Sequence, residues 1–127
     1  MNALVSIITP SYNSAKFIAE TIQSVQNQTY PNWEMIIVDD GSSDETERVV
    51  LSIIQNDNRI QFHKLNQNSG PAVARNTGIE KASGDYMTFI DADDIWFPTF
   101  IENNIKTIQE TGIPFVFSSY KRANVQL

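Results

Sequence analysis

The order of apolar segments constrains the fold of this 127-residue chain more than any other feature. Short runs of β-branched residues, which favour strands, alternate with segments whose apolar residues recur at helical spacing. Strands are predicted over residues 3–9, 34–40, 60–65, 85–91 and 114–120, and helices within residues 15–28, 41–57, 71–82 and 98–110. Because parallel strands need crossover connections, this alternation predicts an α/β fold in one domain, with a mostly parallel sheet flanked by helices on both faces.

Local signals mark the helix ends. Ser14 is predicted to be the N-cap of the first helix, and Asp44 with Glu47 to form a capping pair before the second. Pro71 suits the first turn of the third helix, and Gly112 suits the end of the fourth.

The charge balance and composition exclude several kinds of partner and chemistry. The net charge is −6 and Lys and Arg form no run, so a nucleic-acid-binding surface is not expected. The absence of cysteine excludes disulfides, thiolate catalysis and zinc–thiolate sites, and it favours a cytoplasmic location. No apolar run approaches the roughly 18 residues that a membrane span needs, so peripheral association with the inner face of a membrane would require a segment not present here.

Polar or acidic residues follow three of the predicted strands. The first strand ends in TPSYN, the second in DDGSSD and the fourth in DADD. In parallel sheets the carboxyl ends of the strands share one edge, where α/β proteins bind ligands, so these segments are predicted to form one site. Each segment taken alone is also consistent with an ordinary polar loop.

The DADD segment places Asp91, Asp93 and Asp94 within four positions, where like charges repel one another. Residues two apart on a strand face the same side, so Asp91 and Asp93 could face one ligand while Ala92 points inward. Carboxylates bind Mg²⁺ or Mn²⁺, and such an ion could bridge to a diphosphate. The alternative is that Asp93 or Asp94 caps the helix starting near Pro98, which leaves Asp91 unexplained.

At the end of the second strand, Asp39 or Asp40 offers a carboxylate, which accepts hydrogen bonds and donates none. Such a group suits a base edge that presents an N–H, as uracil and guanine do. Gly41 allows the backbone to turn closely, and Asp44 is better explained as the cap of the following helix.

Four motifs together carry a family resemblance: VSIITPSYN, QTYPNWEMIIVDDGSSDET, NSGPAVARNTGI and GDYMTFIDADD. In this order and at these intervals they closely resemble the nucleotide-sugar-binding half of family 2 glycosyltransferases, which have the GT-A fold. The resemblance runs from about residue 4 to residue 120. It implies transfer of a sugar, with inversion, from a nucleotide-diphospho-sugar such as a UDP-sugar to a saccharide or lipid-linked acceptor.

The resemblance also implies roles for individual residues. Pro10 and Tyr12 would line the nucleoside pocket, with the Tyr12 ring near uracil and ribose. Asp40 would accept a hydrogen bond from uracil N3–H, and Arg75 would lie near the base or the diphosphate as a cation. Asp91 would hold the ribose, directly or through water.

The metal site follows from the same resemblance. Asp93 would bind the divalent ion, Mg²⁺ or Mn²⁺, that bridges the diphosphate, with Asp91 as the second carboxylate of the site. Asp94 would support the metal shell or the acceptor.

No catalytic base is identified. Members of the family are about twice as long, and an aspartate well downstream of the DxD motif deprotonates their acceptor. After Asp94 the chain offers only Glu102 and Glu110 as carboxylates, and neither lies in such a motif. We therefore expect residues 1–127 to be a donor-binding portion, with the base and the acceptor half beyond Leu127. Exposed apolar surface would then favour homo-oligomers.

Two other functions stay open. The first is a nucleotide-sugar-binding module without transfer activity. The second is a receiver-like signalling domain that binds Mg²⁺ and uses a lysine such as Lys121.

The remaining conspicuous residues are predicted to be structural. His63 would pack in the third strand, and Trp96, Phe97 and Phe100 would form core beneath the acidic loop.

Overall fold

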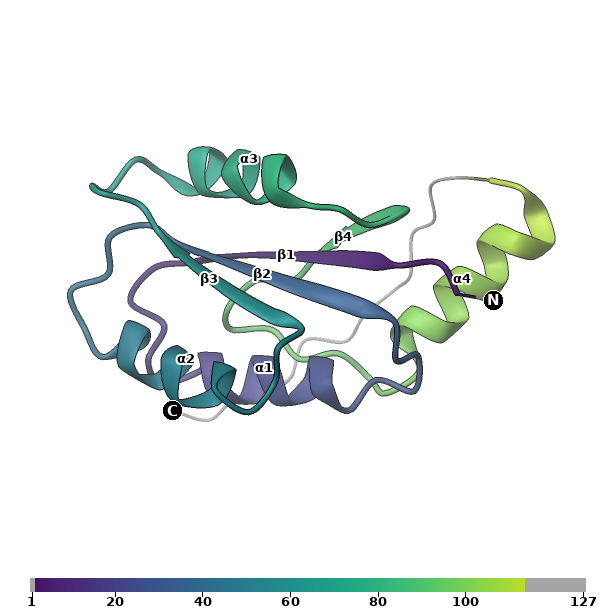
Figure 1. Cartoon of the computed structure of the whole chain (residues 1–127), viewed down its shortest axis with the longest axis horizontal. Coiled ribbons are helices and arrows are strands. Elements are labelled where there is room, and N and C mark those ends of the chain that lie inside the picture. The colour runs from purple at the N-terminus through teal and green to yellow at the C-terminus, as the bar shows by residue number, and fades with distance from the viewer. Residues whose placement is uncertain (1, 114–127) are drawn as a thin grey trace.

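Figure 1 shows the computed structural model, which describes residues 2–113. The strands are β1 (Val5–Ser11), β2 (Trp33–Asp39), β3 (Ile60–Lys64) and β4 (Tyr86–Phe89). The helices are α1 (Ile18–Gln26), α2 (Thr46–Ile54), α3 (Pro71–Lys81) and α4 (Phe100–Thr111). The predicted fifth strand, over residues 114–120, lies outside the described residues.

The four strands form one parallel sheet in the order β3-β2-β1-β4. In Figure 1, α3 covers one face of the sheet while α1 and α2 cover the other, which confirms the predicted α/β layers. The chain steps outward from β1 to β3 and then returns to the far side of β1 to form β4. This reversal makes a switch point between β1 and β4, where α/β sheets open a crevice for ligands beyond the strand ends.

Apolar side chains bury both faces of the sheet. On one face, Ile7 and Met35 pack with residues of α1, α2 and α4 in the larger cluster. On the other face, Ile36 and Val38 pack with Ala74 of α3. Burial on both sides explains why the central strands read as continuous apolar runs rather than as alternating patterns.

Gly78 lets α3 approach the sheet closely. A Cβ atom at this position would lie 2.6 Å from Ile8 Cγ2, which is closer than real contacts allow. Because Gly78 has no side chain, α3 can pack closely against β1, with the first turn of the helix next to the carboxyl edge of the strands.

β1 continues past its predicted end and includes Pro10. Its last residues pair with β2, whereas pairing with β4 ends at Ile8. The Ile8 carbonyl points toward the β4 side of β1, where it accepts a hydrogen bond from Ile90 N (3.1 Å). The backbone nitrogen of Pro10, two residues later, points to the same side of the strand. Because β4 has already ended there, the missing N–H of proline costs no hydrogen bond of the sheet.

The predicted N-cap of the first helix is wrong. α1 begins at Ile18, and no side chain caps it. The Ser14 hydroxyl instead donates to the Tyr12 carbonyl (3.2 Å), so it stabilises the loop after β1.

The predicted capping pair of the second helix does not form: Glu45, not Asp44, is the N-cap residue of α2, and no side chain makes the cap hydrogen bond. The Asp44 carboxylate accepts a hydrogen bond from Thr46 N (3.0 Å) at the start of α2. Glu47, however, lies 3.3 Å from Lys64 Nζ of β3 and forms an ion pair there. The tertiary contact with the neighbouring strand replaces the local one.

α4 ends as predicted, because Gly112 follows it in the left-handed region at φ +71°. Ile101 and Ile105 join the larger apolar cluster. No helix within residues 2–113, α4 included, has the length and apolar character that a bilayer span requires.

A carboxylate at the amino edge of the sheet links three segments. Glu34 of β2 accepts hydrogen bonds from Ser6 Oγ of β1 (2.5 Å), Ser83 N (2.7 Å) and Ser83 Oγ (2.9 Å). Burial alone would raise the pKa of Glu34, but the hydrogen bonds from Ser6 and Ser83 outweigh it and hold the pKa below the ordinary value of 4.5.

Glu34→Gln is expected to lower the free energy of unfolding at neutral pH by roughly 1–3 kcal/mol, because a hydrogen-bonded charge is lost. Since the folded-state pKa lies below the unfolded value, this contribution is present above pH 4.5 and is lost as the pH falls through the folded-state pKa. Urea unfolding of the wild type and the variant, at neutral pH and again well below pH 4.5, measures both effects.

Glu45→Gln is the matched control, because the Glu45 side chain is 66% exposed and forms an exposed ion pair with Arg48. We expect a change of about 0.5 kcal/mol or less there. Equal losses in the two variants would contradict the role given to Glu34.

Candidate functional site

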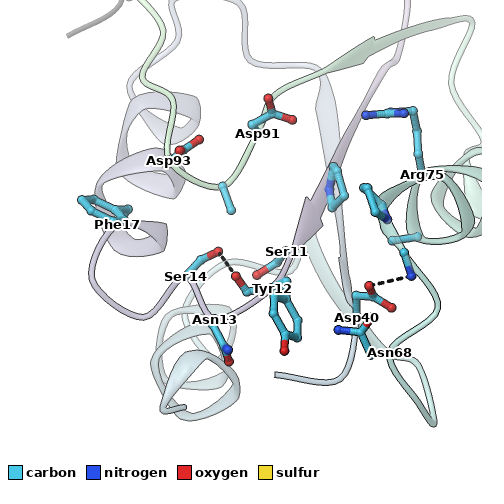
Figure 2. A pocket seen from close by; sticks show the side chains of 15 residues that line it. Ser11, Tyr12, Asn13, Ser14, Phe17, Asp40, Asn68, Arg75, Asp91 and Asp93 are labelled. Carbon is cyan, nitrogen blue, oxygen red and sulfur yellow. Dashed lines mark hydrogen bonds between the residues drawn. The ribbon is translucent and has the colours of Figure 1, made fainter. Parts of the chain in front are cut away.

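A cavity of about 590 Å³ opens at the carboxyl edge of the sheet, beside the switch point between β1 and β4. Figure 2 shows side chains converging on it from the loops after β1, β2 and β4 and from α3. The cavity is lined by every residue predicted to bind the donor or the metal: Pro10, Tyr12, Asp40, Arg75, Asp91 and Asp93. The three strand-end segments therefore meet at one place, as the sheet topology predicts.

Asp91, Asp93 and Asp94 form an acidic cluster after β4. Each offers one carboxylate oxygen, and these oxygens lie within 4.8 Å of one another. The prediction that strand alternation aligns Asp91 with Asp93 is wrong, because β4 ends at Phe89 and a turn closed by Asp94 N and the Asp91 carbonyl (3.0 Å) gathers them. Ala92 does point inward, with 6% exposure. This donor set fits one hard divalent cation, whose charge would offset the carboxylate repulsion.

Polar side chains in and just after α1 hold the acidic loop in place. The buried Thr21 hydroxyl donates to the Ala92 carbonyl (2.9 Å), and the Ser24 hydroxyl accepts from Trp96 N (3.2 Å). Gln28 adds hydrogen bonds to the backbone next to the start of α4. This support was not predicted, although polar residues spaced i, i+3 and i+7 along an apolar helix face are a signal for it.

The predicted alternative, in which an aspartate of this cluster caps the fourth helix, does not hold. α4 begins at Phe100, and its N-cap position is Thr99. Asp93 and Asp94 both lie before that cap, in the turn that faces the cavity.

The two carboxylates after β2 have different surroundings. Asp39 is fully buried and accepts hydrogen bonds from Ser42 N (2.9 Å) and Ser42 Oγ (2.6 Å), so its carboxylate stabilises the loop after β2. Asp40 lines the cavity and accepts from Ser69 N (2.7 Å) and Gly70 N (2.9 Å). Because a carboxylate has about four acceptor positions, Asp40 can still receive a hydrogen bond from a ligand.

The bonds to Asp40 also anchor the start of α3, which the sequence did not predict. Gly70 is the N-cap residue, at φ +99°, and Pro71 follows at the first turn. A carboxylate is favoured at this position because helix N-termini present free N–H groups and a positive dipole end.

Arg75 lines the cavity from α3 and is exposed. Within residues 2–113 the ion pairs are Arg48–Glu45, Arg59–Asp57 and Lys64–Glu47, so Arg75 is not tied to a carboxylate there. Its charge is available to an anionic ligand.

Several cavity residues were not predicted to belong to the site: Ser11, Asn13, Ser14, Phe17 and Asn68. Phe17 lies one residue before α1 begins, and it lines the cavity. Asn13 is the one residue of this set with a detectable signal, because asparagine tolerates left-handed backbone and often marks special turns.

Residues predicted to be structural lie outside the cavity. Trp96 is buried and stacks on Phe100 with ring centroids 4.4 Å apart, as expected for core. Phe97 is 62% exposed, so its assignment to the core is wrong. His63 is half-buried in β3, with its Nε2 atom 3.0 Å from Gln61 Oε1.

Comparison with known proteins assigns the chain to a family. Residues 6–126 match the profile described as glycosyl transferase family 2. The chain belongs to glycosyltransferase family 2. This membership confirms the resemblance carried by the four motifs and removes the receiver-like alternative.

Among curated members of the family, WfgD of Escherichia coli is named UDP-Glc:alpha-D-GlcNAc-diphosphoundecaprenol beta-1,3-glucosyltransferase. It is 42% identical over 121 residues, which are 95% of this chain and 47% of WfgD. The chain spans less than half the length of the curated relatives that it matches.

Solved structures of similar proteins share the fold. TarS of S. aureus in complex with UDP has a TM-score of 0.80 and 32% identity, over 85% of this chain and 32% of the TarS chain. The mannosyltransferase PcManGT from Pyrobaculum calidifontis, in complex with GDP-Man and Mn²⁺, has a TM-score of 0.77 and 28% identity, over 82% of this chain and 32% of its own. These matches confirm the predicted GT-A fold.

Proposed function

We propose that the cavity binds a nucleotide-diphospho-sugar, specifically a UDP-sugar, together with Mg²⁺ or Mn²⁺. The chain would act as the donor-binding portion of an inverting glycosyltransferase that uses a saccharide or lipid-linked acceptor. The observation that carries this proposal is the meeting of Asp40, Arg75 and the acidic cluster on one cavity. The UDP complex of TarS and the name of WfgD support the choice of UDP-sugar and of a lipid-diphosphate acceptor. A sequence without cysteine supports a cytoplasmic location.

The nucleoside would lie over the ends of β1 and β2. Pro10 and the Tyr12 ring, which is 51% exposed, offer an apolar wall for uracil and ribose. Asp40 would accept the uracil N3–H with a lone pair that Ser69 and Gly70 do not use. Figure 2 shows Asp40 and Tyr12 on the side of the cavity away from Asp93.

The diphosphate would lie toward the acidic cluster. Asp93 would hold the divalent ion, with Asp91 beside it and Asp94 in support, and Asp91 would also reach the ribose. Such an ion neutralises the charge that develops on the departing diphosphate. Arg75, on the α3 side of the cavity, would add a second positive charge for the same anion.

Calorimetric titration with UDP, GDP and acetyl phosphate, each with Mn²⁺ and with EDTA, tests this proposal. We expect UDP to bind in the presence of Mn²⁺, GDP to bind less tightly and acetyl phosphate not to bind. A wild-type chain that binds no UDP, or that binds UDP equally with EDTA, would contradict the proposal.

Asp40→Asn is expected to weaken UDP binding by roughly 1–3 kcal/mol, because the amide can present N–H where an acceptor is needed. It should also lower the melting temperature, since both Ser69 N and Gly70 N need an acceptor. Calorimetry with UDP and CDP separates the two effects: cytosine N3 carries no proton, so the wild type should prefer UDP and the variant should narrow the preference.

Equal affinity of the wild type for UDP and CDP would show that Asp40 does not read the base. A variant with a lowered melting temperature and an unchanged preference for UDP would assign to Asp40 only the anchoring of α3.

A further inference from the structure

Tyr12 is half-exposed at the cavity, and the backbone on either side of it is held by hydrogen bonds. Tyr12 lines the cavity and the residue is 51% exposed, so neighbouring groups cover only about half of it. On its N-terminal side, the Ser11 carbonyl accepts a hydrogen bond from Asp40 N (2.8 Å). On its C-terminal side the next residue is Asn13, which has the most unusual backbone in this part of the site.

Asn13 has φ +48°, in the left-handed region, and is the one non-glycine residue within residues 2–113 with positive φ. The Asn13 Oδ1 atom accepts hydrogen bonds from Ser43 N (2.9 Å) and from Asp44 N (3.3 Å), and we call these two bonds the side-chain clasp. The Asn13 N–H donates to Ser42 Oγ (2.7 Å). The loop after β1 is thereby tied to the loop after β2.

The hydrogen bond from Asn13 N to Ser42 leads to a buried carboxylate. The Ser42 hydroxyl and the Ser42 N–H both donate to the fully buried Asp39 carboxylate (2.6 and 2.9 Å). A chain of hydrogen bonds therefore runs from the backbone next to Tyr12 to an acceptor in the interior of the protein. Figure 2 shows Asn13 directly beside Tyr12 at the cavity.

We propose that Asn13 is a positioning residue, whose side chain, bonded to Ser43 N and Asp44 N beside the backbone bond to Ser42, holds the Tyr12 ring in place for the nucleoside. This deepens the proposed function and rests on it. A ring held in its bound position loses less conformational entropy when the nucleoside binds. Removal of the clasp should therefore weaken binding of the nucleoside and leave binding of the metal and diphosphate unchanged.

Asn13→Gly is the informative variant, because glycine keeps the positive φ without strain and removes only the side-chain clasp. UDP affinity in the presence of Mn²⁺ should fall about fivefold to tenfold, the size expected for the loss of one or two hydrogen bonds. Affinity for pyrophosphate with Mn²⁺ should not change. Ser43→Ala is the matched control in the same loop, since it keeps the Ser43 N–H that donates to Asn13 Oδ1 and removes only the long contact from Ser43 Oγ to the same atom (3.5 Å). It should change both affinities by less than about twofold.

A double-mutant cycle with Tyr12→Ala tests the route of the effect. If Asn13 acts through Tyr12, Asn13→Gly has little further effect once the ring is gone. Hydrogen exchange over residues 10–14 gives a readout without any ligand, and it should be faster in Asn13→Gly than in the wild type or in Ser43→Ala.

The outcomes separate this inference from the proposed function. Unchanged UDP affinity in Asn13→Gly, equal losses for UDP and pyrophosphate, or losses that add to those of Tyr12→Ala would each overturn the positioning role. A wild type that binds no UDP would overturn the proposed function itself and the positioning role with it, whatever the exchange data show.

Discussion

Asp93→Ala is expected to remove the dependence of UDP binding on Mn²⁺ while leaving the fold intact. The variant should lose more than about 100-fold in Mn²⁺-dependent affinity, because even substitutions behind a metal ligand commonly cost roughly 10–100-fold. Asp93 is exposed, so its removal exposes no core. Without metal, the loss of one of three close carboxylates should leave the melting temperature unchanged or raise it slightly.

Calorimetry with UDP and Mn²⁺ on Asp93→Ala and on Glu110→Ala measures this effect. Glu110 is an exposed carboxylate of α4 away from the cavity lining, so its variant has the same net charge as Asp93→Ala. We expect Glu110→Ala to bind as the wild type does. Unchanged Mn²⁺-dependent affinity in Asp93→Ala would refute the metal assignment.

The second large effect concerns transfer itself, for which the 127-residue chain is expected to be nearly inactive. The carboxylates that line the cavity are Asp40, Asp91 and Asp93. Asp40 is assigned to the base of the nucleotide, and the other two are assigned to the metal site, so no carboxylate of the lining is left to deprotonate an acceptor.

Glu102, which follows the acidic cluster in sequence, cannot fill this role from its position. It accepts a hydrogen bond from Thr29 Oγ1 (2.9 Å) and does not line the cavity. Loss of a general base typically removes about 10²–10⁴ in rate.

Release of UDP from a UDP-sugar, followed with this chain beside a longer member of the family, measures the difference. The chain should bind the donor in the calorimeter and yet turn it over at least about 100-fold more slowly. Turnover within tenfold of the longer protein would show that a base does lie among these residues. Donor binding without turnover would equally fit the binding-module alternative, which only a longer protein containing this domain can distinguish.

The sequence predicts the layers of the fold and the meeting of the three loops because those features follow from strong, local patterns. Runs of β-branched residues specify buried strands, and parallel pairing then brings the ends of β1, β2 and β4 to one edge. The positions of Asp40, Arg75, Asp91 and Asp93 at the cavity follow from this topology without any knowledge of side-chain contacts.

Other features of the site depend on contacts between distant segments, which the periodicity of the sequence does not contain. Asp40 binds the backbone of Ser69, 29 residues away, and Thr21 binds the backbone of Ala92, 71 residues away. The expected cap role of Ser14 failed for a different reason, since its hydroxyl donates to the Tyr12 carbonyl, two residues earlier, rather than to the first turn of α1. Each of these side chains is polar and could bond locally, so only the tertiary structure decides its partner.

The most direct test of the account is the position of the metal ion in crystals of this chain with UDP and Mn²⁺. Anomalous diffraction at the manganese edge locates the ion without reference to the protein coordinates. The account predicts one ion within about 2–2.6 Å of an Asp93 carboxylate oxygen, with uracil N3 within hydrogen-bond distance of Asp40. An ion bound away from the acidic cluster, or a uracil ring that leaves Asp40 bonded only to Ser69 and Gly70, would contradict it.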